Sequence, residues 1–352
     1  MRECFAGTCH QSCEELAKFA VDKNIRHVVC VGTGSSYLAA MSEAYAVKEL
    51  LGIPAEVYNS TDLRLYCPEY LGEHSLVLIN SHSGKSPGDI ATVEVAKKKS
   101  AYTVAVTDIA HTGLTESVDF VLMGPGGPKV EMPSTRTYAL AMYRIFIFLS
   151  IWAKLIGREP VTGDCLAELQ ALPDFCDAVI DRYDVLGKEI AEKIQGAESF
   201  LVMAHGTNIS TAQEGAMGLS QASNKPSQGF LLEEYLHGHI QGLPKNVAMV
   251  IIGVPGPSQS RMVGFGKVAH ALGMDVLTLV PDDNTHLVAY GDAISYPSTT
   301  IREIFTPAFT CIPFWFIGYY LTLVKKGDPD LLMANDERFI NAHISEYKKE
   351  YV

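Results

Sequence analysis

Strand-type runs of apolar residues recur in this chain at a constant offset of 172 residues. Three pairs of runs share the offset: Val28–Gly34 with Phe200–Gly206, Leu76–Asn80 with Ala248–Ile252, and Thr103–Asp108 with Asp275–Val280. A repeat of this length is too long for a solenoid unit and indicates a tandem duplication of a whole domain. The length of 352 residues also suggests about two domains.

Helix-type stretches lie between the strand-type runs. In the first half we predict strands at His27–Val31, Ser75–Asn80, Thr103–Thr107 and Phe120–Gly124, and helices that include Ser36–Leu51 and Gly88–Lys99. Strict alternation of this kind is typical of βαβ units with a parallel sheet between helices. The expected fold class is α/β, with two tandem doubly wound parallel-sheet domains of flavodoxin-like type.

The expected organisation has five parts. They are an N-terminal helical segment at 1–24, a phosphate-binding domain at 25–156, a helical connector at 157–198, a second domain at 199–325 and a C-terminal tail at 326–352. The connector contains Pro160 and Pro173, with helical patterns at Cys165–Leu172 and Tyr183–Lys193.

Composition argues against several classes of partner. The net charge is −12 with no long basic run, which disfavours nucleic acid and anionic membranes. The apolar stretches Tyr138–Ile156 and Ile304–Val324 contain charge or proline, so we predict buried core helices and no membrane partner. The start of the chain has no apolar signal core, so the expected location is cytoplasmic.

The eight cysteines form no C-x-x-C pair, and scattered reduced thiols are expected. Cys4, Cys9 and Cys13 lie close together, but no matching His/Cys cluster completes a zinc site. We therefore expect no metal.

A polar turn at residues 80–86 follows the strand Ser75–Asn80 and precedes a helix. Free backbone N–H groups at a helix N-terminus and serine hydroxyls suit an anion such as a phosphate. The alternative is an ordinary turn in which a serine caps the helix. The corresponding turn of the second half, Gly253–Ser258, has lost the Ser-x-Ser-Gly pattern and holds two prolines, which lack N–H donors. The anion site is therefore expected in the first half alone.

A second serine-containing turn, with Ser35 and Ser36, follows the strand His27–Val31. It lacks the G-x-G-x-x-G pattern because residue 37 is Tyr, which disfavours a dinucleotide. Neighbouring parallel strands end at one edge of a sheet, so both turns are expected to line one cleft. Ser134 and Thr135 precede the helix that closes this half, where each could cap the helix or contact a ligand.

The second half carries the residues suited to proton transfer. Glu214 and Gln221 lie seven residues apart, on one face of a predicted helix at Thr211–Ala222. His237 and His239 follow Glu233 and Glu234, and a histidine near its free pKa can move protons at neutral pH. The alternatives are half of a metal site, for which no third ligand is evident, or histidines that cap a helix or lie at an interface.

As an ordered set these motifs resemble the sugar isomerase (SIS) family, from about residue 20 to residue 330. The segments that carry the resemblance are GTGSSY at 32–37, SHSGKS at 81–86, EMPSTR at 131–136, QEGA at 213–216 and EYLHG at 234–238. Within that family the chain resembles fructosamine-6-phosphate deglycases and the isomerising part of glucosamine-6-phosphate synthase.

The resemblance implies a role for each matching position. A ketose 6-phosphate would bind through a set of donors in the two turns: Ser35, Ser36, Ser81, His82, Ser83 and Ser86. Gly34, Ser134 and Thr135 would be further substrate contacts. His237, with Glu234 three residues before it, would open the sugar ring, often across a dimer interface. The resemblance thus implies a sugar phosphate as ligand, a homodimer with a shared active site and no cofactor.

One departure from the family concerns the enolising base. The family has a glutamate sixteen residues before its histidine, and this chain has Gln221, which cannot act as a general base near neutral pH. Glu214 or Glu233 substitutes, or another group does, or the chain has lost standard isomerase chemistry. Lys348 and Lys349 are no clean match for the catalytic lysine of the synthase. Without a recognisable glutaminase domain, glutamine-dependent amination is not expected.

The expected function is deglycation of a fructosamine 6-phosphate to a hexose 6-phosphate and a free amine. One alternative is a phosphosugar isomerase that acts on an aminohexose phosphate. The other is a non-catalytic phosphosugar sensor, which Gln221 favours.

Overall fold

The computed structural model describes residues 1–127, 133–158, 163–243, 246–330, 336–339 and 341–342. Glu131, Met132, Pro160, Lys348 and Lys349 lie outside these ranges. The chain divides into two compact units: unit 1 is Met1–Pro173 with Asn341–Val352, and unit 2 is Asp174–Ile340.

Unit 1 contains a five-stranded sheet in which every neighbouring pair of strands is parallel. The strand order is β2-β1-β3-β4-β5, with bounds β1 His27–Gly32, β2 Ala55–Asn59, β3 Ser75–Asn80, β4 Tyr102–Thr107 and β5 Phe120–Met123. The predicted strands of this half are confirmed, and β2 is an addition to them.

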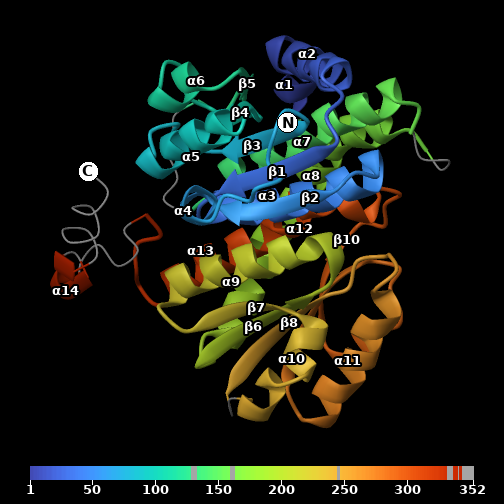
Figure 1. Cartoon of the computed structure of the whole chain (residues 1–352). Helices are drawn as coiled ribbons and strands as arrows, with labels where there is room; N and C mark the ends of the chain where they lie inside the picture. Colours follow the sequence, from blue (N-terminus) through green and yellow to red (C-terminus); the bar gives the residue numbers. More distant parts are fainter. Residues whose placement is uncertain (128–132, 159–162, 244–245, 331–335, 340, 343–352) are drawn as a thin grey trace. The chain divides into compact units, whose positions relative to one another are not determined.

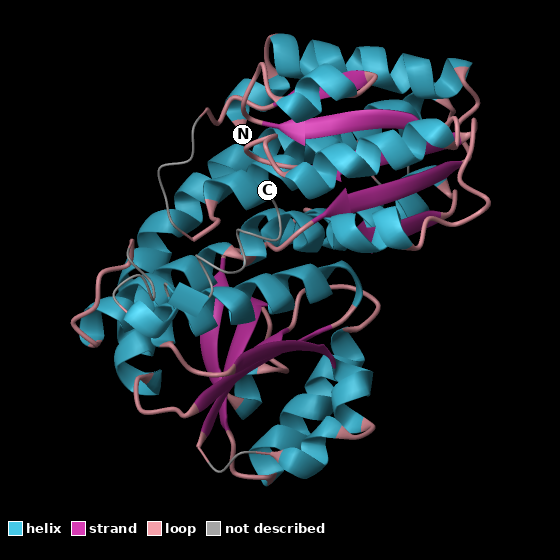
Figure 2. Ribbon diagram, turned by 60° about the vertical axis from the view of Figure 1, so that its left-hand side comes forward, coloured by secondary structure: helices cyan, strands magenta, loops and turns pink. Residues whose placement is uncertain are grey.

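Helices cover both faces of the unit 1 sheet (Figures 1 and 2). The helices are α1 Arg2–Phe5, α2 Thr8–Asp22, α3 Ser35–Ala46 with a π-helical turn Val47–Leu51, α4 Ser60–Leu65, α5 Pro87–Lys98, α6 Gly113–Ser117 and α7 Arg136–Leu155. Side chains alternate between the faces of a strand, so Val29 and Val77 pack with α4, α5 and α6, in one cluster with Leu63, Val93 and Leu114. The opposite face meets α3, which packs in turn against α7.

The helix α8 runs from Cys165 to Ile194 without interruption, so the two predicted helical patterns, Cys165–Leu172 and Tyr183–Lys193, are confirmed as parts of one helix that continues through Pro173. A proline inside a helix has no N–H for the carbonyl four residues earlier. Here that carbonyl belongs to Leu169, and it accepts a hydrogen bond from the Tyr143 hydroxyl at 2.6 Å. The tertiary contact replaces the missing helical bond, which explains why the helix continues.

Unit 2 has a second parallel sheet, in the order β10-β9-β8-β6-β7. Its strands are β6 Ser199–Ala204, β7 Ser227–Leu231, β8 Val247–Ile252, β9 Asp275–Pro281 and β10 Asp292–Tyr296. Its remaining helices are α9 Ile209–Ser223, α10 Leu232–Leu236, α11 Gln259–Ala271, α12 Pro307–Thr310, α13 Ile312–Val324 and α14 Glu337–Phe339. Short 3₁₀ turns lie at Gly206–Asn208, His239–Gly242, Val288–Tyr290 and Glu303–Phe305.

The two sheets share strand order and register. β1 pairs with β3 through His27 and Ser75, and β6 pairs with β8 through Ser199 and Val247, at the predicted offset of 172 residues. In unit 2 Asp275 pairs with Ala248, whereas in unit 1 the equivalent of Ala248, Leu76, pairs with Tyr102. The predicted alignment of Thr103 with Asp275 is therefore wrong by one residue. Unit 2 has one more residue between the two strands concerned.

Two helical stretches, Arg136–Leu155 and Glu303–Val324, are long and apolar enough to cross a membrane by length and composition. In their most apolar windows 89% and 67% of the residues are buried inside the protein. The core helix of a globular protein passes the same test, so these helices are weak evidence for a membrane span.

Candidate functional site

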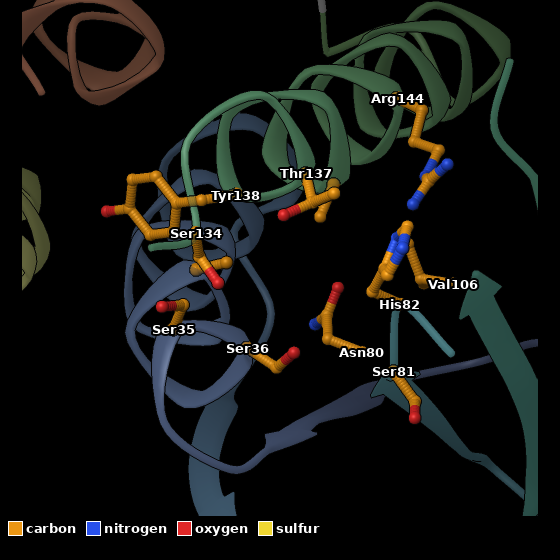
Figure 3. A pocket seen from close by; sticks show the side chains of 12 residues that line it. Ser35, Ser36, Asn80, Ser81, His82, Val106, Ser134, Thr137, Tyr138 and Arg144 are labelled. Carbon is orange, nitrogen blue, oxygen red and sulfur yellow. The ribbon is translucent and has the colours of Figure 1, made fainter. Parts of the chain in front are cut away.

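A small pocket of about 30 Å³ lies in unit 1 at the carboxyl ends of β1, β3 and β4. It is lined by Ser35, Ser36, Ala39, Asn80, Ser81, His82, Val106, Ser134, Thr137, Tyr138, Ala141 and Arg144 (Figure 3). The N-terminal turns of α3 and α7 both contribute to it. Unpaired N–H groups and helix dipoles at two N-termini favour a negatively charged guest.

The turn between β1 and α3 depends on Gly32. A side-chain carbon at this position would overlap the backbone of Ser36, 2.6 Å from its carbonyl oxygen. Gly34, at the N-cap of α3, has a positive φ of 61°, which glycine adopts at little cost. The two glycines bring the first turn of α3, with Ser35 and Ser36, against the end of the strand.

The serine loop at 81–86 divides its hydroxyls between different partners. The buried Asp89 carboxylate accepts hydrogen bonds from Ser60, at 2.5 Å, and from Ser81 and Ser86. Burial raises the pKa of Asp89, and these three hydrogen bonds oppose the shift. Ser86 also caps α5 by accepting from the Asp89 N–H at 3.4 Å, as the capping alternative expects. The loop is therefore anchored through Asp89.

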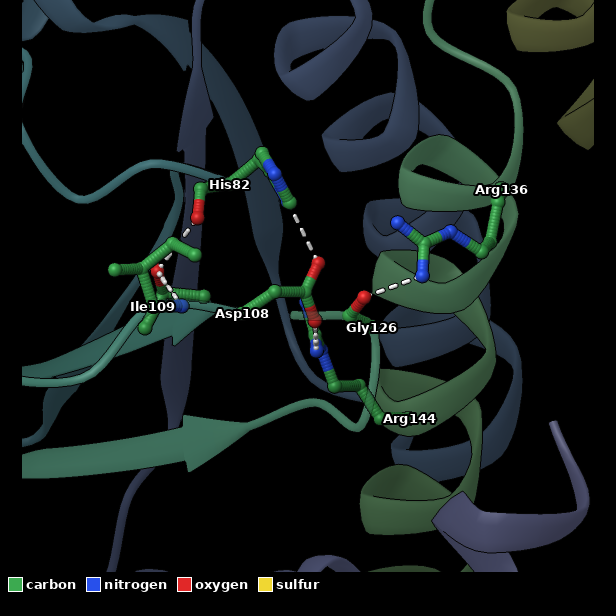
Figure 4. A network of polar contacts seen from close by, with 7 residues as sticks. His82, Asp108, Ile109, Gly126, Arg136 and Arg144 are labelled. Atoms are coloured by element: carbon green, nitrogen blue, oxygen red, sulfur yellow. Dashed lines mark hydrogen bonds and ion pairs between the residues drawn. The ribbon is translucent and has the colours of Figure 1, made fainter. Parts of the chain in front are cut away.

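His82 belongs to a line of three polar side chains that begins in the pocket (Figure 4). Its Nδ1 lies 2.8 Å from Asp108 Oδ2, and Asp108 Oδ1 lies 2.5 Å from an Arg144 guanidinium nitrogen. Arg144 and Asp108 are 1% and 5% exposed, which makes theirs a buried ion pair. Because a carboxylate only accepts, Nδ1 of His82 carries the proton and Nε2 is the atom available to a ligand.

The pairing determines the charge of Asp108. Burial alone would raise its pKa, but the positive charge and hydrogen bond of Arg144, with a smaller contribution from His82, hold the pKa below its usual value. Asp108 therefore stays ionised and neutralises the buried guanidinium. A side-chain carbon at Gly124 would overlap both Arg144 and Asp108, so glycine is required beside the pair.

A second buried polar pair adjoins the pocket. Asn80, which is 1% exposed, donates from Nδ2 to Glu43 Oε2 at 2.8 Å. Glu43 is fully buried on α3, and burial raises its pKa to about 8, against opposing contributions from Asn80 and Arg144. Glu43 Oε1 and Asn80 Oδ1 are both buried without a hydrogen-bond partner.

The pocket brings together five of the residues expected to contact substrate: Ser35, Ser36, Ser81, His82 and Ser134. Gly34, Ser83, Ser86 and Thr135 are outside its lining. Ser83 is exposed, and Thr135 stands at the N-cap of α7 without a capping bond from its side chain.

In unit 2, His237 follows α10 and is exposed. Its Nδ1 lies 2.9 Å from the backbone carbonyl oxygen of Glu233, which only accepts hydrogen bonds. Nδ1 therefore carries the proton, and in the neutral ring the exposed Nε2 has the lone pair. This tautomer suits a group that takes a proton from a sugar hydroxyl.

The carboxylates of unit 2 have different surroundings. Glu214 is 4% exposed on α9, whereas Gln221 on the same helix is half-buried and Glu234 on α10 is exposed. Glu233 is held by Arg261 in a two-pronged ion pair, with N–O distances of 2.6 and 2.8 Å. A carboxylate committed to an arginine in this way is poorly placed to take a proton from carbon.

His205 directly follows β6 and lies near that ion pair, with Nε2 at 4.0 Å from Glu233 Oε1. Burial lowers the pKa of His205, and the negative charge of Glu233 opposes the shift. Among the described residues, no group of three or more His, Cys, Asp or Glu side chains is arranged to hold a metal ion.

The main residues that sequence reasoning missed are Glu43, Asn80, Asp108 and Arg144. Arg144 was noticed only as a charge that interrupts an apolar helix. A charged residue inside such a helix is rarely buried without a partner, and that was the available signal. The partner, Asp108, lies 36 residues away, a spacing that no local motif covers.

Comparison with known proteins finds a family model that matches part of the chain. The family model of the SIS domain matches residues 23–150, the part of unit 1 that contains the pocket. Glutamine–fructose-6-phosphate aminotransferase (isomerizing) from Caldanaerobacter subterraneus is 24% identical over 310 residues, which cover 88% of this chain and 50% of that protein. The chain thus spans about half the length of the curated relatives that it matches.

Two solved structures share the fold. The C-terminal domain of glucosamine-fructose-6-phosphate aminotransferase from Francisella tularensis has a TM-score of 0.83 at 20% identity, covering 89% of this chain and 88% of that one. Tagatose-6-phosphate ketose/aldose isomerase from Escherichia coli has a TM-score of 0.76 at 17% identity, covering 91% and 89%. The chain therefore carries a SIS domain at residues 23–150 and shows homology to the isomerizing aminotransferases.

Proposed function

We propose that this chain binds a sugar phosphate through the unit 1 pocket and catalyses the deglycation of a fructosamine 6-phosphate. The observation that carries the proposal is the convergence of Ser35, Ser36 and His82 with two helix N-termini on one pocket. The serine hydroxyls and the helix N–H groups are donors suited to phosphate oxygens. The buried Arg144 adds a positive charge behind them, although Asp108 offsets it.

The chemistry would take place at the other end of the sugar. His237 Nε2 assists ring opening, a base moves a proton between C1 and C2, and the ketosamine becomes an aldosylamine. Water then adds at C1 and the C1–N bond breaks, which releases a hexose 6-phosphate and a free amine. Ring opening and the shift between C1 and C2 only move protons, and the final hydrolysis consumes one water, so no redox partner is required.

Two carboxylates, Glu214 and Glu233, are candidates for the base that moves the proton between C1 and C2. Glu214 is a buried carboxylate on the same helix as Gln221, and we propose it ahead of Glu233, which Arg261 already engages. We further propose that the second unit is a SIS-type domain and that the chain works as a homodimer with a shared active site. The shared strand order and register of the two sheets support the first of these.

The test is to incubate the protein with fructoselysine 6-phosphate and measure glucose 6-phosphate with a coupled dehydrogenase. We expect turnover that Ser36→Ala weakens through KM and that His237→Ala reduces through kcat. Ser12→Ala, on α2 and outside the pocket lining, is the matched control and should behave like the unaltered protein. No turnover across a panel of fructosamine 6-phosphates would refute the deglycase assignment.

A non-catalytic phosphosugar sensor is the second candidate, and Gln221 is the observation that favours it. Such a protein would bind fructose 6-phosphate or glucosamine 6-phosphate in calorimetry and convert neither of them. Conversion of an aminohexose phosphate, without release of an amine from fructosamines, would instead identify a plain isomerase.

A further inference from the structure

The pocket proposed to bind a phosphate presents a buried oxygen where an anion needs a donor. Figure 3 shows the side-chain oxygen of Asn80 directed toward the pocket, with its nitrogen turned away. That nitrogen donates to Glu43, while Asn80 Oδ1 and Glu43 Oε1 have no partner. Two unpaired buried acceptors side by side are costly, and an approaching anion would add to the repulsion.

The two ends of an amide exchange roles when the side chain turns about its last bond. The orientation in which Nδ2 donates to Glu43 suits an ionised carboxylate, which can only accept. If Glu43 carries a proton, its O–H can donate to Asn80 Oδ1 instead. The amide then turns its NH₂ group into the pocket, and both the orphaned amide oxygen and the missing anion donor are accounted for.

We propose that Asn80 is a ligand of the phosphate group and that protonation of Glu43 determines whether Asn80 offers it a donor or an acceptor. Glu43 is thus a positioning residue, which acts on the ligand through Asn80. The inference rests on the proposed function, because it assumes that this pocket holds the phosphate.

The surroundings of Glu43 are consistent with a proton at this site. It is fully buried, and the groups that face it are Asn80 from β3, Arg144 from α7 and the Cys30 thiol from β1. Arg144 is already paired with Asp108, and its positive charge opposes the rise of the Glu43 pKa without cancelling it. Burial raises the pKa of Glu43 to about 8 and raises the pKa of the Cys30 thiol strongly, so both groups are largely neutral at pH 7.

Sulfate is the appropriate probe, because it is a dianion that does not titrate between pH 6.5 and 9.5. For a site that binds only when a group of pKa about 8 is protonated, affinity falls about tenfold between pH 7 and pH 9. We expect this fall in calorimetric titrations of the His82→Gln variant, in which the imidazole no longer contributes. In Glu43→Gln/His82→Gln, the new amide donates to Asn80 Oδ1 at every pH, so the fall should disappear.

The matched control is Glu94→Gln/His82→Gln, which removes an exposed carboxylate of α5 and should keep the tenfold fall. A second measurement uses His82→Gln alone and needs no Glu43 variant. At pH 8.5, sulfate binding should be accompanied by the uptake of more than half a proton per site. The number of protons is obtained from binding enthalpies in two buffers of different ionisation enthalpy. An unchanged pH profile in the Glu43 variant, or no proton uptake, would overturn this inference and leave the proposed function intact. Failure of both sulfate and fructose 6-phosphate to bind at any pH would overturn the proposed function as well.

Discussion

Removal of Arg144 should expose the cost of a buried carboxylate that has lost its guanidinium partner and keeps only the hydrogen bond from His82. Asp108 lies 2.5 Å from the Arg144 guanidinium, and the two side chains are 0% and 1% exposed. Breaking such a pair by removing one partner typically costs about 3–5 kcal/mol, because the remaining charge has no water around it. We therefore expect Arg144→Met to lower the free energy of unfolding of unit 1 by about 3–5 kcal/mol at pH 7.5. Met keeps most of the apolar stem of arginine, so the loss reports mainly on charge.

The pH dependence makes the prediction specific. In the native protein the pKa of Asp108 is below its usual value, so its contribution to stability is present above that usual value and is lost as the pH falls. Without Arg144, burial dominates and the folded-state pKa rises above the unfolded one. The pH dependence of the Asp108 contribution then reverses, and that contribution to stability is lost as the pH rises through the folded-state pKa of Asp108. The deficit of Arg144→Met should therefore be smaller at pH 4.5 than at pH 7.5.

The assay is urea unfolding followed by the fluorescence of Trp152, which is buried on α7, in a Trp315→Phe background. Asp108→Asn/Arg144→Met has no buried charge and should be more stable than Arg144→Met at pH 7.5, with no reversal. The exposed pair of Lys99 and Glu69 is the control, and Lys99→Met should lower the free energy of unfolding far less than Arg144→Met does. An Arg144→Met deficit below about 1 kcal/mol, or one equal at both pH values, would refute the reasoning.

Three further predictions concern other parts of the chain. Tyr143→Phe leaves the Leu169 carbonyl without a donor and should lower the free energy of unfolding in urea by about 1–3 kcal/mol. The loss should be smaller in a Pro173→Ala background, because residue 173 then has a backbone N–H that can donate to this carbonyl. An equal loss in both backgrounds would contradict this. Glu43 has a folded-state pKa of about 8, raised from 4.5, so its contribution to stability is complete below pH 4.5 and is lost as the pH rises through 8. The melting temperature of the unaltered protein should therefore fall between pH 6 and pH 9, and that of Glu43→Gln should fall less. An equally steep fall in both proteins would argue against this. Gln221→Glu should raise the turnover of fructoselysine 6-phosphate at least tenfold if position 221 is the base site, whereas no gain, combined with loss of activity in a Glu214→Gln variant, would assign the base to Glu214.

The fold was largely predictable because central parallel strands are buried on both faces. Ser75–Asn80 and Val247–Ile252 are almost continuous apolar runs, and every residue of both strands is buried. The strands that were missed lie at sheet edges, as β2 and β10 do, and only part of their surface is covered. Their mixed sequences do not differ enough from those of loops to be recognised.

The site was predictable where its chemistry is local. Serine and glycine at a strand-to-helix turn indicate an anion site from a few consecutive residues, and the pocket does collect Ser35, Ser36 and His82. The partners that orient those residues come from elsewhere in the chain. His82 is oriented by a carboxylate 26 residues away, and Asn80 is paired with a glutamate 37 residues away. Tertiary folding alone brings these groups together, so no pattern of consecutive residues reveals them.

The two sheets share their register but differ at the edge where we propose the anion site of unit 1. In unit 2 the corresponding turn after β6 contains Gly206, with a φ of 55°, and the turn after β8 contains Gly256. The Glu303 carboxylate lies against both turns: a side-chain carbon at Gly206 would be 3.1 Å from Oε1, and one at Gly256 would overlap Oε2. A phosphate at this edge would meet a negative charge of the protein itself. The equivalent edges of the two sheets therefore differ: the turns of unit 1 offer hydroxyl donors, whereas a carboxylate lies against the turns of unit 2.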